Sequence, residues 1–169
     1  MKKKDKILVF AAHPDDEVLG CGGTIAKLSK QYEISIICMT NGVDARKHDE
    51  IVSKKLVLER QKAAKISSKI LKCKNIFFLD FPDNQMDSVP LLKIVKQVES
   101  FIAKIKPKII FTHRIDDLNI DHEITNRAVV TATRPEKKNK VDLTLFFDIP
   151  SSTEWNMNGK KKNIVPLCN

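Results

Sequence analysis

Residues 6–23 read KILVFAAHPDDEVLGCGG, an apolar run that ends abruptly in a histidine, a proline and three acids. The first part, residues 6–12, is apolar enough on both faces to predict a fully buried strand. Ligands of open α/β sheets bind in the crevice just beyond the carboxyl ends of such strands. This stretch therefore predicts the first strand of a parallel sheet and a functional site at its end. The polar cluster that follows the strand consists of His13, Asp15, Asp16 and Glu17.

The alternation of apolar and amphipathic segments continues along the chain. Strands are predicted at residues 6–12, 33–40, 75–79, 108–112 and 142–148. Helices are predicted at residues 17–31, 51–72, 90–105 and 121–133. Regular alternation of strand and helix indicates a mostly parallel central sheet with helices on both faces. We therefore expect an α/β, three-layer Rossmann-like fold, with one domain over residues 1–155 and an irregular lysine-rich tail over residues 156–169.

The composition is that of a globular domain. The chain has 169 residues, of which 42% are hydrophobic, which is enough for one substantial core. Its apolar runs are far shorter than the ~20 residues of a membrane-spanning helix. The first run follows several lysines, as in a signal peptide, but His13 and the acids interrupt it after a few residues. We therefore expect a cytoplasmic protein, and four cysteines without a C-x-x-C pair agree with a reducing compartment.

The formal net charge is +9, and lysines supply most of it. A solvated, lysine-rich surface explains this charge, and so does attraction to anionic lipid headgroups or nucleotide-linked substrates. Peripheral contact with a membrane therefore stays open. Nucleic acid is not an expected partner, because the chain has one Trp, one Tyr and no interleaved aromatic-basic motif.

A second polar cluster follows the strand predicted at residues 108–112. Since the carboxyl ends of parallel strands share one edge of a sheet, the two clusters can converge on one pocket. Imidazoles and carboxylates there suit Zn²⁺ with an open coordination position, which lowers the pKa of a bound water to ~7. The acids could instead be helix caps, with Asp15 or Asp16 capping the first helix and Asp121 the last. The second cluster, THRIDDLNIDHE, contains His113, Asp116, Asp117, Asn119, Asp121 and His122.

Two motifs resemble those of a known family. Residues 11–28 (AAHPDDEVLGCGGTIAKL) closely resemble the signature of the PIG-L/LmbE-type N-acetyl-sugar deacetylases, and residues 116–129 (DDLNIDHEITNRAV) resemble the later Asp-His motif of that family. Such proteins are zinc hydrolases that remove the acetyl group from an N-acetylglucosamine-type amine. The resemblance covers most of residues 6–155. Similarity to a bacterial branch of the family extends to TNG at 40–42, FPD at 81–83, TATRP at 131–135 and IPSSTEW at 149–155.

The resemblance implies a role for each matching residue. Zinc would be bound by His13, Asp16 and His122, although such ligands also accept Fe²⁺ or Co²⁺. Asp15 would be the general base, which must lie within hydrogen-bond reach of the attacking water. Asp121 would orient a neighbouring imidazole.

Three further positions either allow two interpretations or depart from the family pattern. Arg60 aligns with an arginine that contacts substrate hydroxyls or phosphate, but a solvated helix arginine is an equal alternative. Many family members carry a histidine where this chain has Asn119, whose amide can donate a hydrogen bond but cannot supply a proton. His113 is the nearest spare imidazole and is the candidate for contacting the substrate, unless it only ends its strand.

The leading hypothesis is a metal-dependent hydrolase that removes the N-acetyl group from an N-acetylglucosamine-type sugar or glycoconjugate. Family members usually continue well beyond the SSTEW segment, so this chain is expected to be short at its C-terminus. The alternatives are a hydrolase of another small N-acyl amine and a truncated, catalytically weak protein that binds zinc or a sugar.

Overall fold

The computed structural model describes residues 4–45, 49–135, 140–150 and 152–153. Within these residues, a single sheet has its strands in the order β3-β2-β1-β4-β5, and every pair of neighbours is parallel. The strands are β1 (Lys6–Ala11), β2 (Glu33–Thr40), β3 (Asn75–Phe81), β4 (Ile109–His113) and β5 (Leu143–Phe147). The helices are α1 (Asp16–Leu28), α2 (Glu50–Ile70), α3 (Leu91–Ile105) and α4 (Ile120–Ala132), with a 3₁₀ turn η1 (Met86–Ser88).

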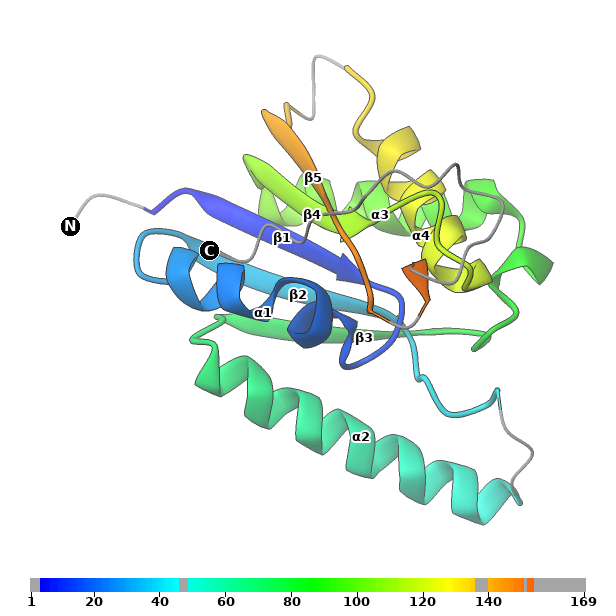
Figure 1. Ribbon diagram of the computed structural model, residues 1–169. Helices are drawn as coiled ribbons and strands as arrows, with labels where there is room; N and C mark the ends of the chain where they lie inside the picture. The colour runs from blue at the N-terminus through cyan, green and yellow to red at the C-terminus, as the bar shows by residue number, and fades with distance from the viewer. Residues whose placement is uncertain (1–3, 46–48, 136–139, 151, 154–169) are drawn as a thin grey trace.

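Helices cover both faces of this sheet, so the predicted three-layer α/β fold is confirmed. Helices α1 and α2 lie on one face, and α3 and α4 lie on the other (Figure 1). The element bounds differ from the predicted ones mainly at their ends: α1 stops at Leu28, and β3 continues to Phe81. The predicted tail at 156–169 lies outside the described residues.

The core has two parts because the central strands are buried on both faces. One part joins the sheet to α3 and α4 through residues such as Phe10, Met39 and Ile94, all fully buried. The other part joins the sheet to α1 through Val9 and Ile25. Burying one such side chain contributes about 1.5–3 kcal/mol, which explains why the sequence of β1 is apolar on both faces.

The strand order places a crevice between β1 and β4. The chain moves outward from β1 to β2 and β3, then crosses back to β4 on the other side of β1. In such sheets the loops after the two central strands leave in opposite directions and open a binding site between them. No helix in the described ranges is long and apolar enough to cross a membrane.

Candidate metal centre and cavity

Three buried side chains meet just beyond the carboxyl ends of β1 and β4. They are His13, which follows β1, Asp16 at the start of α1, and His122 in the first turn of α4. One ligand atom from each lies within 4.8 Å of the other two. His13 Nδ1 is 3.1 Å from Asp16 Oδ2 and 3.2 Å from His122 Nε2, and His122 Nε2 is 3.2 Å from Asp16 Oδ2. The fold therefore brings together the two predicted clusters.

Carboxylates surround the His13 imidazole. Burial alone would lower its pKa, but hydrogen bonds to Asp121, Asp16 and Asp83 outweigh burial and raise the pKa of His13 to about 11. On the far side of the ring, His13 Nε2 lies 3.2 Å from Asp121 Oδ2 and 3.3 Å from Asp83 Oδ1. The same surroundings that favour an imidazolium also attract a metal cation.

Asp121 lies against His13, where the resemblance places an orienting residue. Its side chain is fully buried, and it accepts hydrogen bonds from two backbone N–H groups, those of Asn84 at 2.6 Å and Met86 at 3.1 Å. Both donors belong to the loop and turn that follow β3. Asp121 therefore joins α4, this loop and the His13 ring in one network.

Asp83, which the sequence did not single out as a site residue, is the second carboxylate on His13 Nε2. Its Oδ1 accepts a hydrogen bond from the Thr40 hydroxyl at 3.2 Å, and its Oδ2 accepts one from the Ala45 N–H at 2.9 Å. Burial would raise the pKa of Asp83, but its contact with His13 and the bonds from Ala45 and Thr40 keep it below its usual value. The sequence feature that could have identified Asp83 is its place in the FPD segment, directly after a predicted strand.

Asp117, which the sequence placed in the second cluster without assigning it a role, contacts the other histidine. Its Oδ2 lies 3.1 Å from His122 Nδ1, which leaves His122 Nε2 facing Asp16 and His13. The hydroxyls of Ser152 and Thr153 donate to the same oxygen, at 3.0 and 2.6 Å. Burial would raise the pKa of Asp117, but these contacts lower it to about 2.

Neither the Asp15 side chain nor the Asp121 side chain caps its helix, so the helix-cap alternative does not hold for these two residues. Asp15 occupies the N-cap position of α1 without a capping bond from its side chain, and Asn119, not Asp121, caps α4 by accepting from the Asp121 N–H at 2.9 Å. Asp15 also has φ 156°, a backbone conformation that costs energy in a non-glycine residue. The Asp15 side chain points instead to Arg60, whose Nη2 lies 2.7 Å from Asp15 Oδ2.

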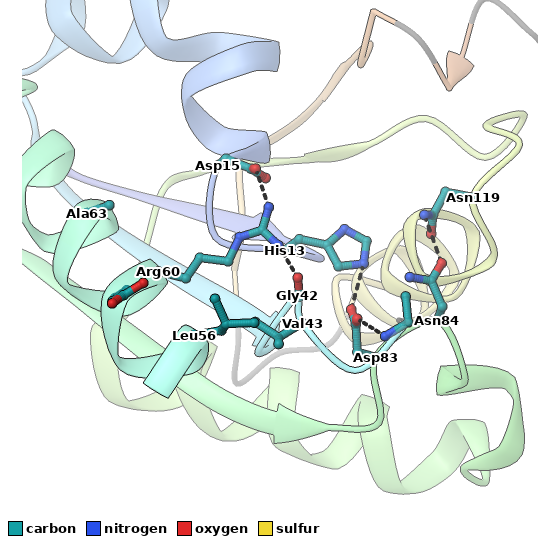
Figure 2. A pocket seen from close by; sticks show the side chains of 12 residues that line it. His13, Asp15, Gly42, Val43, Leu56, Arg60, Ala63, Asp83, Asn84 and Asn119 are labelled. Carbon is teal, nitrogen blue, oxygen red and sulfur yellow. Dashed lines mark hydrogen bonds and ion pairs between the residues drawn. The ribbon is translucent and has the colours of Figure 1, made fainter. Parts of the chain in front are cut away.

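An open cavity of about 620 Å³ lies in front of His13 (Figure 2). Arg60 enters it from α2, and its guanidinium also donates to the backbone carbonyl of Gly42. Gly42 has φ +69°, which glycine adopts without the strain of a side chain. The polar lining consists of His13, Asp15, Glu59, Arg60, Asp83, Asn84 and Asn119.

His113 is the last residue of β4, which was one of its two predicted roles. It is fully buried, it is not among the residues that line the cavity, and its ring stacks on that of His122 with centroids 3.9 Å apart. The Ala12 N–H donates to His113 Nε2 at 2.9 Å, so this nitrogen is an acceptor and carries no proton. Burial lowers the pKa of His113 to about 4, against the opposite effect of Asp16, whose Oδ2 lies 3.4 Å from His113 Nε2.

The PIG-L family, described as GlcNAc-PI de-N-acetylase, matches residues 8–133 of this chain. This protein belongs to the PIG-L family. The match contains the whole cluster around His13 together with Arg60 and Asp83, so the resemblance inferred from the two motifs is confirmed.

Named relatives of this PIG-L protein are longer than the chain. The diacetylchitobiose deacetylase of Thermococcus kodakarensis is 32% identical over 106 residues, which are 62% of this chain and 39% of that protein. The probable N-acetyl-alpha-D-glucosaminyl L-malate deacetylase 2 of Bacillus cereus is 29% identical over 135 residues, which are 75% of this chain and 60% of that protein.

A solved structure shows the same fold. The N,N'-diacetylchitobiose deacetylase from Pyrococcus horikoshii has a TM-score of 0.74 with this chain at 24% identity, covering 86% of this chain and 61% of that one. In all three comparisons the match spans less than two thirds of the relative's own length.

Proposed function

We propose that this protein is a zinc-dependent N-deacetylase that releases acetate from an N-acetylated sugar of the N-acetylglucosamine type. One observation carries the proposal: Asp15, a carboxylate on the cavity wall, directly precedes Asp16 and lies two residues after His13, and both of these residues belong to the buried cluster. A metal-ligand set beside a carboxylate that is not one of the ligands is the arrangement that amide hydrolysis by an activated water requires. Membership of the PIG-L family and two relatives named as deacetylases support the same reaction.

The donor set fits a divalent transition metal. His13, Asp16 and His122 offer two imidazole nitrogens and one carboxylate oxygen, which is a set that zinc accepts while keeping a position open. Asp121 and Asp117 hold the outer nitrogens of the two imidazoles, as partners of metal-binding histidines do. A zinc ion held there would activate a water molecule and polarise the acyl oxygen of the substrate.

The remaining steps belong to the side chains of this protein. Asp15 accepts the proton of the attacking water and returns it to the nitrogen of the departing amine, so that the amine leaves in neutral form. Arg60, anchored on the Gly42 carbonyl, orients the Asp15 carboxylate toward the cavity. Asp121 and Asp83 keep the His13 ring in one orientation.

The cavity is suited to a sugar rather than to an apolar amide. Hydroxyl groups need both donors and acceptors, and the wall supplies carboxylates, a guanidinium and two side-chain amides. Val43 and Leu56 add a small apolar surface on which a sugar ring can pack. These features support N-acetylated sugars, which is also the class that the names of the two deacetylase relatives describe.

The test combines metal content with acetate release. Purified protein is expected to hold about one metal ion per chain and to release acetate from N-acetylglucosamine or diacetylchitobiose. Asp15→Asn is expected to keep the metal and lose most of the activity, whereas Asp80→Asn, at an exposed position on β3, is the matched control and keeps both. Release of another acyl group, with no acetate from any sugar, would replace the proposed substrate class while leaving the hydrolase in place.

A further inference from the structure

We infer that Asn84, rather than Asn119, presents the amide donor that binds the carbonyl oxygen of the substrate's acetyl group; this inference rests on the proposed deacetylase function. Asn84 lies in the loop after β3, far in sequence from both metal-site motifs. It lines the cavity together with His13 and Asn119. Hydrogen bonds leave only one way to orient the side-chain amides of Asn119 and Asn84.

The orientation of Asn119 follows from a backbone group. The N–H of Asp121 can only donate, and its acceptor, at 2.9 Å, is the side-chain oxygen of Asn119. The nitrogen of the Asn119 amide is therefore turned the other way, toward Asn84. Because that oxygen caps α4, the N-terminus of the helix fixes the orientation of the Asn119 amide.

The orientation of Asn84 then follows from that of Asn119. The Asn119 Nδ2 group donates to Asn84 Oδ1 at 3.1 Å, so the oxygen of the Asn84 amide faces Asn119. The NH₂ group of Asn84 lies in the same plane and points away from that oxygen, and Figure 2 shows it turned toward the side of the cavity on which His13 lies. Within the described ranges, no hydrogen-bond acceptor is recorded for this NH₂ group.

The backbone of Asn84 supports the same conclusion. Its N–H donates to Asp121 Oδ2 at 2.6 Å, and Asp121 Oδ2 lies 3.2 Å from His13 Nε2, so Asn84 is tied directly to the metal-site network. Its φ of +51° is a conformation in which asparagine and glycine are favoured over other residues. These contacts fix the backbone from which the exposed Asn84 side chain extends on the rim.

Among the described residues that line the cavity, the side-chain amides are those of Asn84 and Asn119, and the NH₂ group of Asn119 is directed to Asn84. Carboxylates dominate the wall around His13, and the Arg60 guanidinium is directed to Asp15 and Gly42. An acyl oxygen gains negative charge when water attacks its carbon, and a preorganised amide donor stabilises that charge. Asn119 is then a positioning residue, which acts by turning the Asn84 donor toward the substrate.

The test uses variants that keep the loop conformation. Asn84→Gly removes the donor and tolerates a positive φ, and Asn84→Asp keeps the acceptor for Asn119 while replacing the NH₂ group by an oxygen. We expect both variants of the metal-loaded protein to bind a full complement of metal and to lose about 10²-fold in kcat/KM for acetate release, mostly in kcat. Gln85→Glu, one residue further on and exposed, is the charge-matched control and is expected to stay within about twofold of the parent.

A second readout separates this inference from the proposed function. Acetate itself is titrated into the metal-loaded parent and variants, and both Asn84 variants are expected to bind it about tenfold more weakly. If the parent releases acetate and both Asn84 variants match it, the role of Asn84 is wrong and the deacetylase function stands. If the parent releases no acetate, the proposed function fails, and the acetate titration alone decides whether Asn84 contacts a carboxyl group: weaker binding in both variants supports the contact, and unchanged binding rules it out.

Discussion

Arg60 Nη2 lies 2.7 Å from Asp15 Oδ2, and the same guanidinium donates to the backbone carbonyl of Gly42. Asp15 directly precedes α1 and Arg60 lies in α2, and both side chains are more than a third exposed on the cavity wall. A guanidinium is planar and offers several donors in fixed directions, so an arginine held at one end orients the group at its other end. The pair therefore links α2 to the carboxylate that we propose as the general base.

Replacement of Arg60 is expected to slow the reaction without removing the metal. Arg60→Ala leaves Asp15 without its partner, and loss of one orienting contact lowers kcat/KM by about 10–10²-fold. Arg60→Lys is expected to recover only part of this loss, because an ammonium group cannot contact Asp15 and Gly42 with the same geometry. Lys62→Ala, on the same helix and exposed, serves as the control, and equal losses in the two alanine variants would argue against an orienting role.

Removal of the metal is expected to abolish acetate release and to lower the thermal stability. A ligand that binds only the folded state stabilises it by about 2.7 kcal/mol when present at a hundredfold excess over its Kd. Treatment with a chelator should therefore lower both the Tm and the activity, and added Zn²⁺ should restore both. In His122→Ala the chelator is expected to have no further effect on the Tm, because one of the three donors is missing.

Replacement of Asp117 tests the contact that orients His122. Asp117→Asn weakens the hold on His122 Nδ1, and loss of such a partner typically lowers metal affinity by about 10–10²-fold. The affinity is measured by competition with a coloured chelator. Asp116→Asn, a neighbouring position whose carboxylate pairs with Arg114, is expected to bind metal as the parent does. An unchanged affinity in Asp117→Asn would mean that His122 is held by packing alone.

The amphipathic pattern of α3 gives a direct test of the core. Ile94 is fully buried between α3 and the sheet, so Ile94→Ala removes apolar contacts and leaves a cavity, at a cost of about 2–5 kcal/mol in the free energy of unfolding. Leu92 lies two residues earlier and is 66% exposed, so Leu92→Ala is expected to change that free energy by less than about 0.5 kcal/mol. Urea denaturation measures both, and similar values would contradict the assigned face of the helix.

The buried cysteines are expected to resist modification in the native protein. Burial raises the pKa of the Cys21 and Cys38 thiols well above the ordinary value, so both stay protonated at pH 8, where the reactive thiolate is scarce. Burial also raises the pKa of Cys73, to about 11, but this residue is only partly covered. Alkylation followed by peptide mapping should therefore label Cys73 before Cys21 and Cys38, and all three in guanidinium chloride. Rapid native labelling of Cys38 would show that β2 opens readily.

Most of the fold could be predicted from the sequence, because local patterns carry the information. Strands apolar on both faces, such as β1 and β2, must be buried between layers, and alternation with helices implies parallel pairing. The ends of elements were less predictable, since the last turn of α1 and the last residues of β3 depend on contacts that periodicity does not describe.

The sequence by itself also determined where the metal-binding side chains would come together. The cluster after β1 and the cluster after β4 had to meet at one edge of a parallel sheet, and His13, Asp16 and His122 do so. Only the tertiary structure decided which neighbouring residues contact that cluster. Asp83 and Asp117 contact the two imidazoles, Asn119 is turned to cap α4, and His113 is buried under His122. The reason is physical: strand order follows from patterns along the chain, whereas side-chain direction in loops follows from hydrogen bonds between segments that are distant in sequence.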